Sequence, residues 1–143
     1  MKKPFVLFIC KHNTGRSQMA EAYVRRFAHG RLDVASAGTI AASEPDPGVV
    51  RVMAEDGVDI SSAVPKLLDP AMIDRADRII TMGCDVVGVG RIDADWNLPD
   101  PKGATLEDVR AIRDRVKGNA ADLVREFGII PGPYDALLEG RRE

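Results

Sequence analysis

The pattern of the first 30 residues constrains the fold of this chain more than any other feature. Residues 5–9 are apolar without alternation, which is typical of a parallel strand covered on both faces. From residue 16 onward apolar residues recur at helical spacing, and Gly30 then offers a helix end. The apolar positions of this segment are Met19, Ala20, Tyr23, Val24, Phe27 and Ala28. The sequence therefore predicts a strand, a tight loop and a helix in direct succession.

The rest of the chain continues this alternation of strands and helices. Further strands are expected at residues 32–37, 78–82 and 95–98. Asp46-Pro47 and Asp69-Pro70 each resemble an N-cap followed by proline at the first helical position, and Thr105 can cap the longest helix, which Gly128 ends. We therefore predict an α/β fold of three layers, in which a four-stranded parallel sheet carries helices on both faces. In such folds the functional site lies at the carboxyl ends of the strands.

Length, composition and charge limit the classes of protein to which the chain can belong. Its 143 residues suit a single domain, 1–143, in which residues 129–143 form a tail with a short turn at residues 134–140. With 45% hydrophobic residues and a net charge of -2, it has no basic face for nucleic acid or an anionic membrane. No apolar run is long enough to span a bilayer, so we expect a cytoplasmic protein. Two cysteines, Cys10 and Cys84, cannot form a disulfide framework and are expected to be free thiols; no metal site is predicted.

The loop after the first strand carries the residues best suited to chemistry. Asn13 and Gly15 tolerate left-handed backbone angles, so the loop can curl with its N–H groups turned inward as a nest for an anion. The start of the following helix adds partial positive charge, and Arg16 can bind a tetrahedral oxyanion through two hydrogen bonds. The predicted oxyanion-binding residues are Lys11, His12, Asn13, Thr14, Gly15 and Ser17, together with Arg16. The same groups favour the thiolate of Cys10, which we predict to be the nucleophile.

Two residues of this loop are open to a structural interpretation as well. Ser17 can donate a hydrogen bond to the Cys10 thiolate, or it can cap the N-terminus of the helix. His12 is expected to be a loop-surface residue that tunes the local charge rather than an acid or a base.

The order and spacing of several motifs resemble the low-molecular-weight protein tyrosine phosphatase superfamily, and especially its arsenate reductase branch. The resemblance covers about residues 5–127. It begins with the loop at residues 10–17 and the Gln18-Met19-Ala20-Glu21-Ala22 that follows. It continues through Ser36-Ala37-Gly38-Thr39, Gly57-Val58-Asp59-Ile60-Ser61, Thr81-Met82-Gly83-Cys84 and Asp95-Trp96-Asn97-Leu98-Pro99-Asp100-Pro101. The resemblance implies the phosphatase-like fold, a catalytic role for Cys10 and Arg16, and a general acid at Asp100, which protonates the departing oxygen. From its position alone, Asp100 would be a turn residue before proline.

The pocket chemistry favours arsenate reduction over phosphoester hydrolysis. In the tyrosine phosphatases that the chain resembles, aromatic residues after the Ser-Ala-Gly-Thr stretch and after Asp-Pro hold the phenyl ring of the substrate. This chain has Ile40-Ala41-Ala42 and Lys102-Gly103 at those places. Arsenate is small and needs no such walls. We therefore expect an arsenate reductase. A low-molecular-weight protein tyrosine phosphatase and a non-catalytic protein that holds arsenate, phosphate or sulfate in the loop are the alternatives.

The source of electrons follows from the resemblance too. Thioredoxin-coupled reductases relay electrons through two further cysteines, and here Gly83 stands at the position of the first of these, with Cys84 one residue late. The Thr-Met-Gly-Cys pattern resembles the branch that recruits an external small thiol such as mycothiol, with a redoxin as a further partner. Cys84 is thus a candidate redox residue, although packing at a strand end is the commoner role of such a thiol.

Lys66 either supplies a tethered positive charge where relatives place ligands for potassium or is an exposed lysine.

Overall fold

A four-stranded parallel sheet forms the central layer of the computed structural model, which describes residues 2–40, 42–83 and 88–132. The strands are β1 (Phe5–Cys10), β2 (Asp33–Gly38), β3 (Arg78–Thr81) and β4 (Ala94–Asp95), and their order in the sheet is β2-β1-β3-β4. The predicted parallel α/β architecture is therefore confirmed. The expected turn at residues 134–140 and Cys84 lie outside the described residues.

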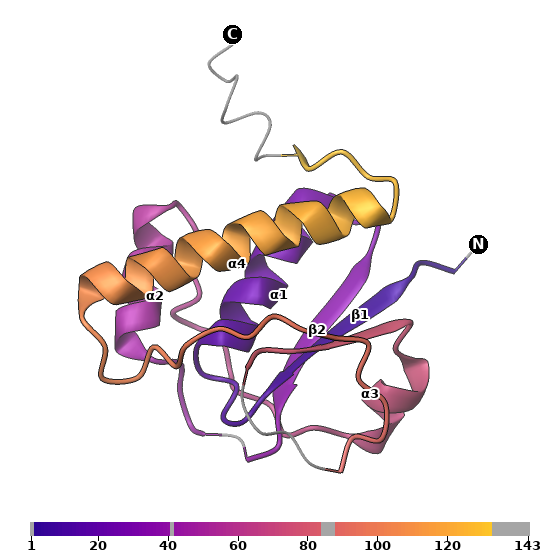
Figure 1. Ribbon diagram of the computed structural model, residues 1–143, viewed down its shortest axis with the longest axis horizontal. Helices are drawn as coiled ribbons and strands as arrows, with labels where there is room; N and C mark the ends of the chain where they lie inside the picture. The colour runs from indigo at the N-terminus through magenta and orange to yellow at the C-terminus, as the bar shows by residue number, and fades with distance from the viewer. Residues whose placement is uncertain (1, 41, 84–87, 133–143) are drawn as a thin grey trace, which may run out of the picture.

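The helices cover the two faces of the sheet unequally. The helices are α1 (Arg16–Ala28), α2 (Pro47–Glu55), α3 (Pro70–Arg75) and α4 (Leu106–Glu126). Helix α4 crosses α1, with α2 beside them, whereas the short α3 lies apart from these three (Figure 1). No helix in the described part of the chain combines the length and the apolar character needed to cross a membrane.

Alternate side chains of β1 divide the core into two clusters. Val6, Phe8 and Cys10 belong to the larger cluster, which includes the apolar faces of α1 and α4. Phe5, Leu7 and Ile9 belong to the smaller cluster, against which α3 packs. Because both faces of β1 are covered, the strand has no polar alternation, as its sequence predicted. The same alternation turns the Cys10 side chain toward the α1 side of the sheet.

The helix starts follow the capping residues that the sequence predicted. The Asp46 carboxylate accepts the backbone N–H of Gly48 at 2.8 Å, and the Asp69 carboxylate accepts that of Ala71 at 2.9 Å. Proline occupies the first turn of each helix. Thr105 caps α4 through the backbone N–H of Asp108, at 3.1 Å.

The last strand differs from the expectation. Residues 95–98 were expected to be extended, but β4 is only Ala94–Asp95. Asn97 has a φ of 49°, in the left-handed region, which an extended strand cannot accommodate. Pairing with β3 nevertheless continues, since the Trp96 N–H donates to the Thr81 carbonyl at 2.9 Å and the Leu98 N–H to the Met82 carbonyl at 3.2 Å. The 96–98 segment therefore stays beside the end of β3.

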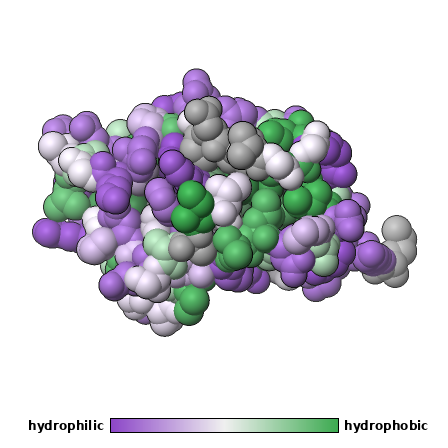
Figure 2. All heavy atoms as spheres, turned by 90° about the horizontal axis from the view of Figure 1, so that it is seen from below, coloured by the Kyte–Doolittle hydropathy of each residue, from purple (hydrophilic) through white to green (hydrophobic). Residues whose placement is uncertain are grey.

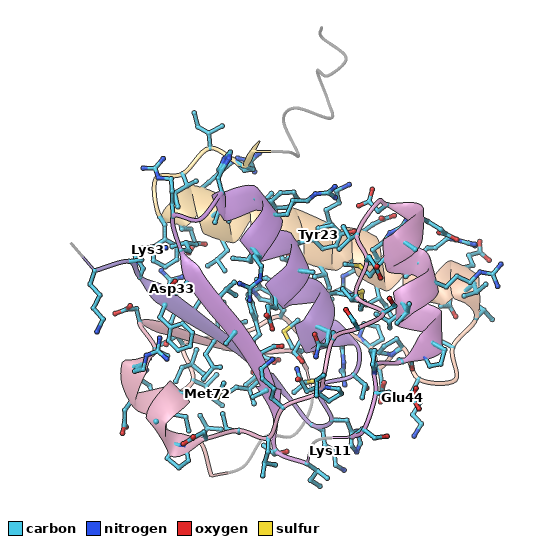
Figure 3. All side chains as sticks on the ribbon, turned by 180° about the vertical axis from the view of Figure 1, so that it is seen from behind. Lys3, Lys11, Tyr23, Asp33, Glu44 and Met72 are labelled. Carbon is cyan, nitrogen blue, oxygen red and sulfur yellow. The ribbon has the colours of Figure 1, made fainter. Side chains whose placement is uncertain are left out.

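A partly buried hydrogen bond joins α1 to the end of α2. The Tyr23 hydroxyl donates to Asp56 at 2.6 Å, and Lys117 of α4 lies 2.9 Å from the same carboxylate. Figure 3 labels Tyr23 on α1, near α4. Burial alone would raise the pKa of Asp56, but the hydrogen bonds from Tyr23 and Lys117 hold that pKa below its usual value. Burial also raises the pKa of Tyr23, so its hydroxyl stays protonated as a donor.

We expect Tyr23→Phe to lower the free energy of unfolding by about 1 kcal/mol at neutral pH, because it removes this hydrogen bond and little volume. A carboxylate with a lowered folded-state pKa stabilises the fold above its ordinary pKa, and this contribution is lost as the pH falls through the lowered value. The difference between variant and wild type should therefore shrink in acid. Urea unfolding at pH 7 and pH 3 measures it, and an equal difference at both would contradict the assignment.

Candidate active site

Cys10 ends β1 and is almost completely buried at the base of the loop that follows. Its sulfur accepts the backbone N–H of Asn13 at 3.2 Å and lies 2.8 Å from the Ser17 hydroxyl. Register places Cys10 opposite Gly38 of β2, and Ile9 opposite Thr81 of β3. The loop therefore meets the carboxyl ends of both neighbouring strands, where the sequence predicted the site.

Asn13 holds the loop in its curled form. It has a φ of 57° and no exposed surface. Its side-chain oxygen accepts the backbone N–H of Lys66 at 2.8 Å, which fixes the orientation of the amide group. Its side-chain nitrogen donates to the hydroxyls of Ser17, at 2.8 Å, and Ser36, at 2.9 Å. The side chain that tolerates the left-handed angle thus also ties the loop to β2 and α1.

Ser17 contacts the sulfur and does not cap the helix. The N-cap of α1 is Gly15, which has no side chain to cap with, and Ser17 lies within the first turn. The N-cap interpretation is therefore wrong. Because the Asn13 amide can only donate to the Ser17 oxygen, the hydroxyl proton remains available for the Cys10 sulfur. A hydroxyl in this arrangement stabilises a thiolate.

The hydrogen-bond network continues behind the loop to charged residues. The Ser36 hydroxyl donates to Glu21 at 2.6 Å, and the Lys66 ammonium lies 3.7 Å from the same carboxylate oxygen. The Lys66 side chain is 42% exposed, yet it is held within ion-pair distance of Glu21. The geometry thus agrees with a tethered positive charge at this position.

Arg16 is buried, and backbone carbonyl groups hold its guanidinium in place. One terminal nitrogen donates to the backbone carbonyls of Leu98, at 2.8 Å, and Met82, at 3.2 Å. The other lies 4.0 Å from the Asp100 carboxylate, whose side chain is 63% exposed. The backbone just after β3 and β4 thus orients the Arg16 side chain. The Asp100-Pro101 loop lies directly beside the guanidinium.

Gly15 allows the Asp-Pro loop to approach the anion loop. A Cβ atom at this position would lie 2.9 Å from the Pro101 ring and 3.4 Å from Val49. Any side chain here would push residues 100–101 away from the loop. Gly15 does not adopt the left-handed angle that the sequence predicted for it, since its φ is -135°; its role is to set the distance between Arg16 and Asp100.

These elements enclose a cavity of about 170 Å³. Its lining residues are Cys10, Lys11, His12, Thr14, Gly15, Arg16, Asp100, Pro101 and Lys102. Asn13 and Ser17, which were predicted with the oxyanion-binding residues, are fully buried and support the loop instead of lining the cavity. Among the described residues, no group of three His, Cys, Asp or Glu side chains could hold a metal ion. The cavity is smaller than those that usually hold organic ligands and suits a small oxyanion.

Sequence reasoning missed the residues that support the loop. Ser36 and Glu21 complete the network behind Asn13, and the Gln18 side chain donates to the Asn13 backbone carbonyl at 3.1 Å. For Ser36 the pairing of the strands offered a signal. Ser36 lies on β2 two residues before Gly38, the partner of Cys10, and side chains two residues apart in a strand lie on the same face of the sheet. Lys102, which lines the cavity, follows directly after Asp100-Pro101 and could have been expected on that ground.

A second cavity, of about 340 Å³, adjoins the first at His12, Thr14 and Lys102. The segment 42–47 forms its other wall, and none of its described lining residues is aromatic. Figure 3 shows Lys11 and Glu44 at the same end of the molecule, and Figure 2 views that end, where polar residues are interspersed with apolar ones. The aromatic walls that would hold a phenyl ring are therefore missing from the described part of this cavity.

Comparisons with known proteins agree on one family. The model of the low molecular weight phosphotyrosine protein phosphatase family matches residues 5–91. The glutaredoxin arsenate reductase of Synechocystis is 35% identical over 133 residues, covering 89% of this chain and 99% of its own length. The thioredoxin-dependent arsenate reductase of Corynebacterium glutamicum is 38% identical, with a TM-score of 0.73 over 87% of this chain and 61% of its own. A structure described as an arsenate reductase in the phosphate binding state is 32% identical, with a TM-score of 0.78 over 86% of this chain and 98% of its own.

Proposed function

Because the chain belongs to the low molecular weight phosphotyrosine protein phosphatase family, and its relatives above 30% identity include arsenate reductases, we propose that it reduces arsenate to arsenite. The observation that carries the proposal is the cavity around Cys10. It joins a nucleophile, an oxyanion cradle and a carboxyl group in a space of about 170 Å³. An arsenate ion fits such a space, whereas a phosphotyrosine ring would need aromatic walls, which the described part of the adjoining cavity lacks.

The first step forms a bond between Cys10 and arsenic. Arsenate binds to the loop N–H groups and to Arg16, and the Cys10 thiolate attacks the arsenic atom. One arsenic–oxygen bond breaks, and the departing hydroxide takes a proton from the Asp100 carboxyl group and leaves as water. The hydrogen bond from Ser17 stabilises the thiolate before the attack.

The second step transfers two electrons to arsenic. An external thiolate attacks the Cys10 sulfur, and a sulfur–sulfur bond forms while the sulfur–arsenic bond breaks. The electron pair of that bond passes to arsenic, which leaves as arsenite, so that two thiols have been oxidised to one mixed disulfide. A dithiol redoxin then reduces this disulfide and restores Cys10. The glutaredoxin and thioredoxin named for two relatives support a redoxin in this role.

The external thiol belongs to one of two chemical classes. Mycothiol, a neutral thiol, is the reductant to which the Thr81-Met82-Gly83-Cys84 pattern points. Glutathione represents the thiols that carry carboxylates. Cys84 lies outside the described residues, and we propose that it does not act as an internal resolving thiol.

A coupled assay tests the proposal. Arsenate-dependent oxidation of each thiol, with a redoxin supplied, is measured beside the hydrolysis of an aryl phosphate. Hydrolysis without arsenate-dependent thiol oxidation would favour the phosphatase, and binding without turnover would favour the oxyanion-binding protein. Mass spectrometry after one turnover should find the external thiol joined to Cys10, whereas an internal loss of two hydrogens would indicate a Cys10–Cys84 disulfide.

We expect Asp100→Asn to slow the arsenate reaction by about 100-fold, because the amide cannot protonate the departing oxygen. An activated aryl phosphate, whose leaving group needs no proton, should be affected much less in the same variant. The matched control is Lys102→Gln, which changes a neighbouring cavity residue and keeps the carboxylate. Equal losses with both substrates would indicate that Asp100 only shapes the turn, in which it accepts the Lys102 N–H at 3.0 Å.

A further inference from the structure

A larger cavity, of about 590 Å³, opens on the other side of Arg16 and Asp100. Both residues also line the cavity around Cys10, so the two spaces meet at this pair. The remaining described lining residues are Gly83, Asn97, Leu98, Pro99 and Arg115. The volume lies within the range of cavities that hold small organic molecules. A ligand here would lie next to an oxyanion in the loop.

Backbone packing fixes the wall of this cavity. Gly83 has a φ of 95°, and a Cβ atom on it would lie 2.6 Å from the Leu98 nitrogen and 2.8 Å from the Leu98 oxygen. Its N–H donates to the Asp95 carboxylate at 2.7 Å. The 97–99 segment is therefore held against residue 83, and the cavity is bounded by backbone that side-chain motion cannot displace.

Arg115 is the second cation of the cavity. It projects from α4, where one terminal nitrogen is 3.4 Å from the Asn97 carbonyl, and within residues 2–40, 42–83 and 88–132 it forms no ion pair. Its helix neighbours Arg110 and Arg113, by contrast, both bind Glu55. Arg16 is committed to the oxyanion and to two carbonyls, so Arg115 is the guanidinium available for a second anion.

We propose that this cavity binds the external thiol, and that Arg115 recognises a carboxylate of that thiol. The inference rests on the proposed function and narrows it, because it assigns the reductant to the carboxylate-bearing class, with glutathione as the probe, in preference to a neutral thiol such as mycothiol. A guanidinium pairs well with a carboxylate through two parallel hydrogen bonds. A thiol anchored in this way lies beside the Arg16–Asp100 pair, which also lines the cavity around Cys10, and approaches the Cys10 adduct from that side.

Steady-state kinetics of the full chain provide the first test. Arg115→Gln should raise the KM for glutathione about fivefold to tenfold, with kcat and the KM for arsenate little changed. Arg125→Gln is the matched control, since Arg125 lies on the same helix and pairs with Asp122. N-acetylcysteine and its amide differ only in one carboxylate, and Arg115→Gln should affect the acid alone. An equal effect on both thiols, or the same effect in Arg125→Gln, would overturn the inference.

A binding experiment separates this inference from the proposed function. S-methylglutathione cannot transfer electrons, so its affinity is measured by calorimetry with phosphate occupying the loop. We expect binding that Arg115→Gln weakens about fivefold to tenfold and Arg125→Gln leaves unchanged. Such binding in a protein that never reduces arsenate would support the thiol site and refute the function. Arsenate turnover with glutathione that is insensitive to Arg115 would refute the site and support the function.

Discussion

Replacing Cys10 with serine should abolish arsenate turnover and leave oxyanion binding largely intact. The hydroxyl is a far weaker nucleophile than a thiolate, so we expect kcat to fall by about four orders of magnitude or more. The serine oxygen can accept the Asn13 N–H in place of the sulfur, and carbonyls of Met82 and Leu98 hold the Arg16 guanidinium independently of residue 10. Turnover assays and phosphate titration by calorimetry measure the two effects separately.

Arg16→Ala is the informative comparison for that variant. It should weaken oxyanion binding about 30-fold or more as well as abolish turnover, since it removes the buried cation that faces the anion. Thermal unfolding of both variants controls for loss of the fold. If Cys10→Ser kept most of its turnover, or if Arg16→Ala bound phosphate as tightly as wild type, the assigned roles would be wrong.

The sequence predicted those parts of the fold whose determinants are local. The unbroken apolar run of β1, the Asp-Pro helix starts and the Thr105 cap each need only a few neighbouring residues, and the structure contains all of them. The end of the sheet was less predictable. Residues 96–98 pair with β3 without forming a regular strand, because Asn97 turns into the left-handed region to keep Leu98 beside Arg16.

Like the fold, the candidate site has a part that the sequence predicted and a part that depends on residues far apart in the chain. A single continuous segment supplies Cys10 and Arg16, so the loop could be identified from its own residues together with the strand before it and the helix after it. The partners that hold it come from distant parts of the chain: Ser36 from β2, the Lys66 backbone from the connection between α2 and α3, and the Leu98 carbonyl from the segment after β4. A single sequence does not report which donor reaches which acceptor across such separations. For that reason Ser17 could be read as a cap until its partners were known.

Asn13→Ala should test that supporting network most severely. The alanine side chain leaves the Ser17 and Ser36 hydroxyls without their donor in a buried setting, and the Lys66 N–H without its acceptor in a partly buried one. Unsatisfied buried groups and the left-handed backbone together should lower the free energy of unfolding by about 2 to 4 kcal/mol. Turnover should fall about 100-fold, because Ser17 is no longer oriented toward the sulfur.

His29→Ala is the matched control for the backbone contribution. His29 has a φ of 45°, similar to that of Asn13, but it follows α1 at an exposed position far from the loop, where its ring makes only an exposed hydrogen bond with the Ile130 carbonyl, at 3.0 Å. It should cost only about 1 kcal/mol and leave turnover unchanged. Urea unfolding, together with turnover assays, measures both variants. A loss in Asn13→Ala no larger than in His29→Ala would mean that the backbone angle alone is responsible, because the network predicts a clear excess in both stability and turnover.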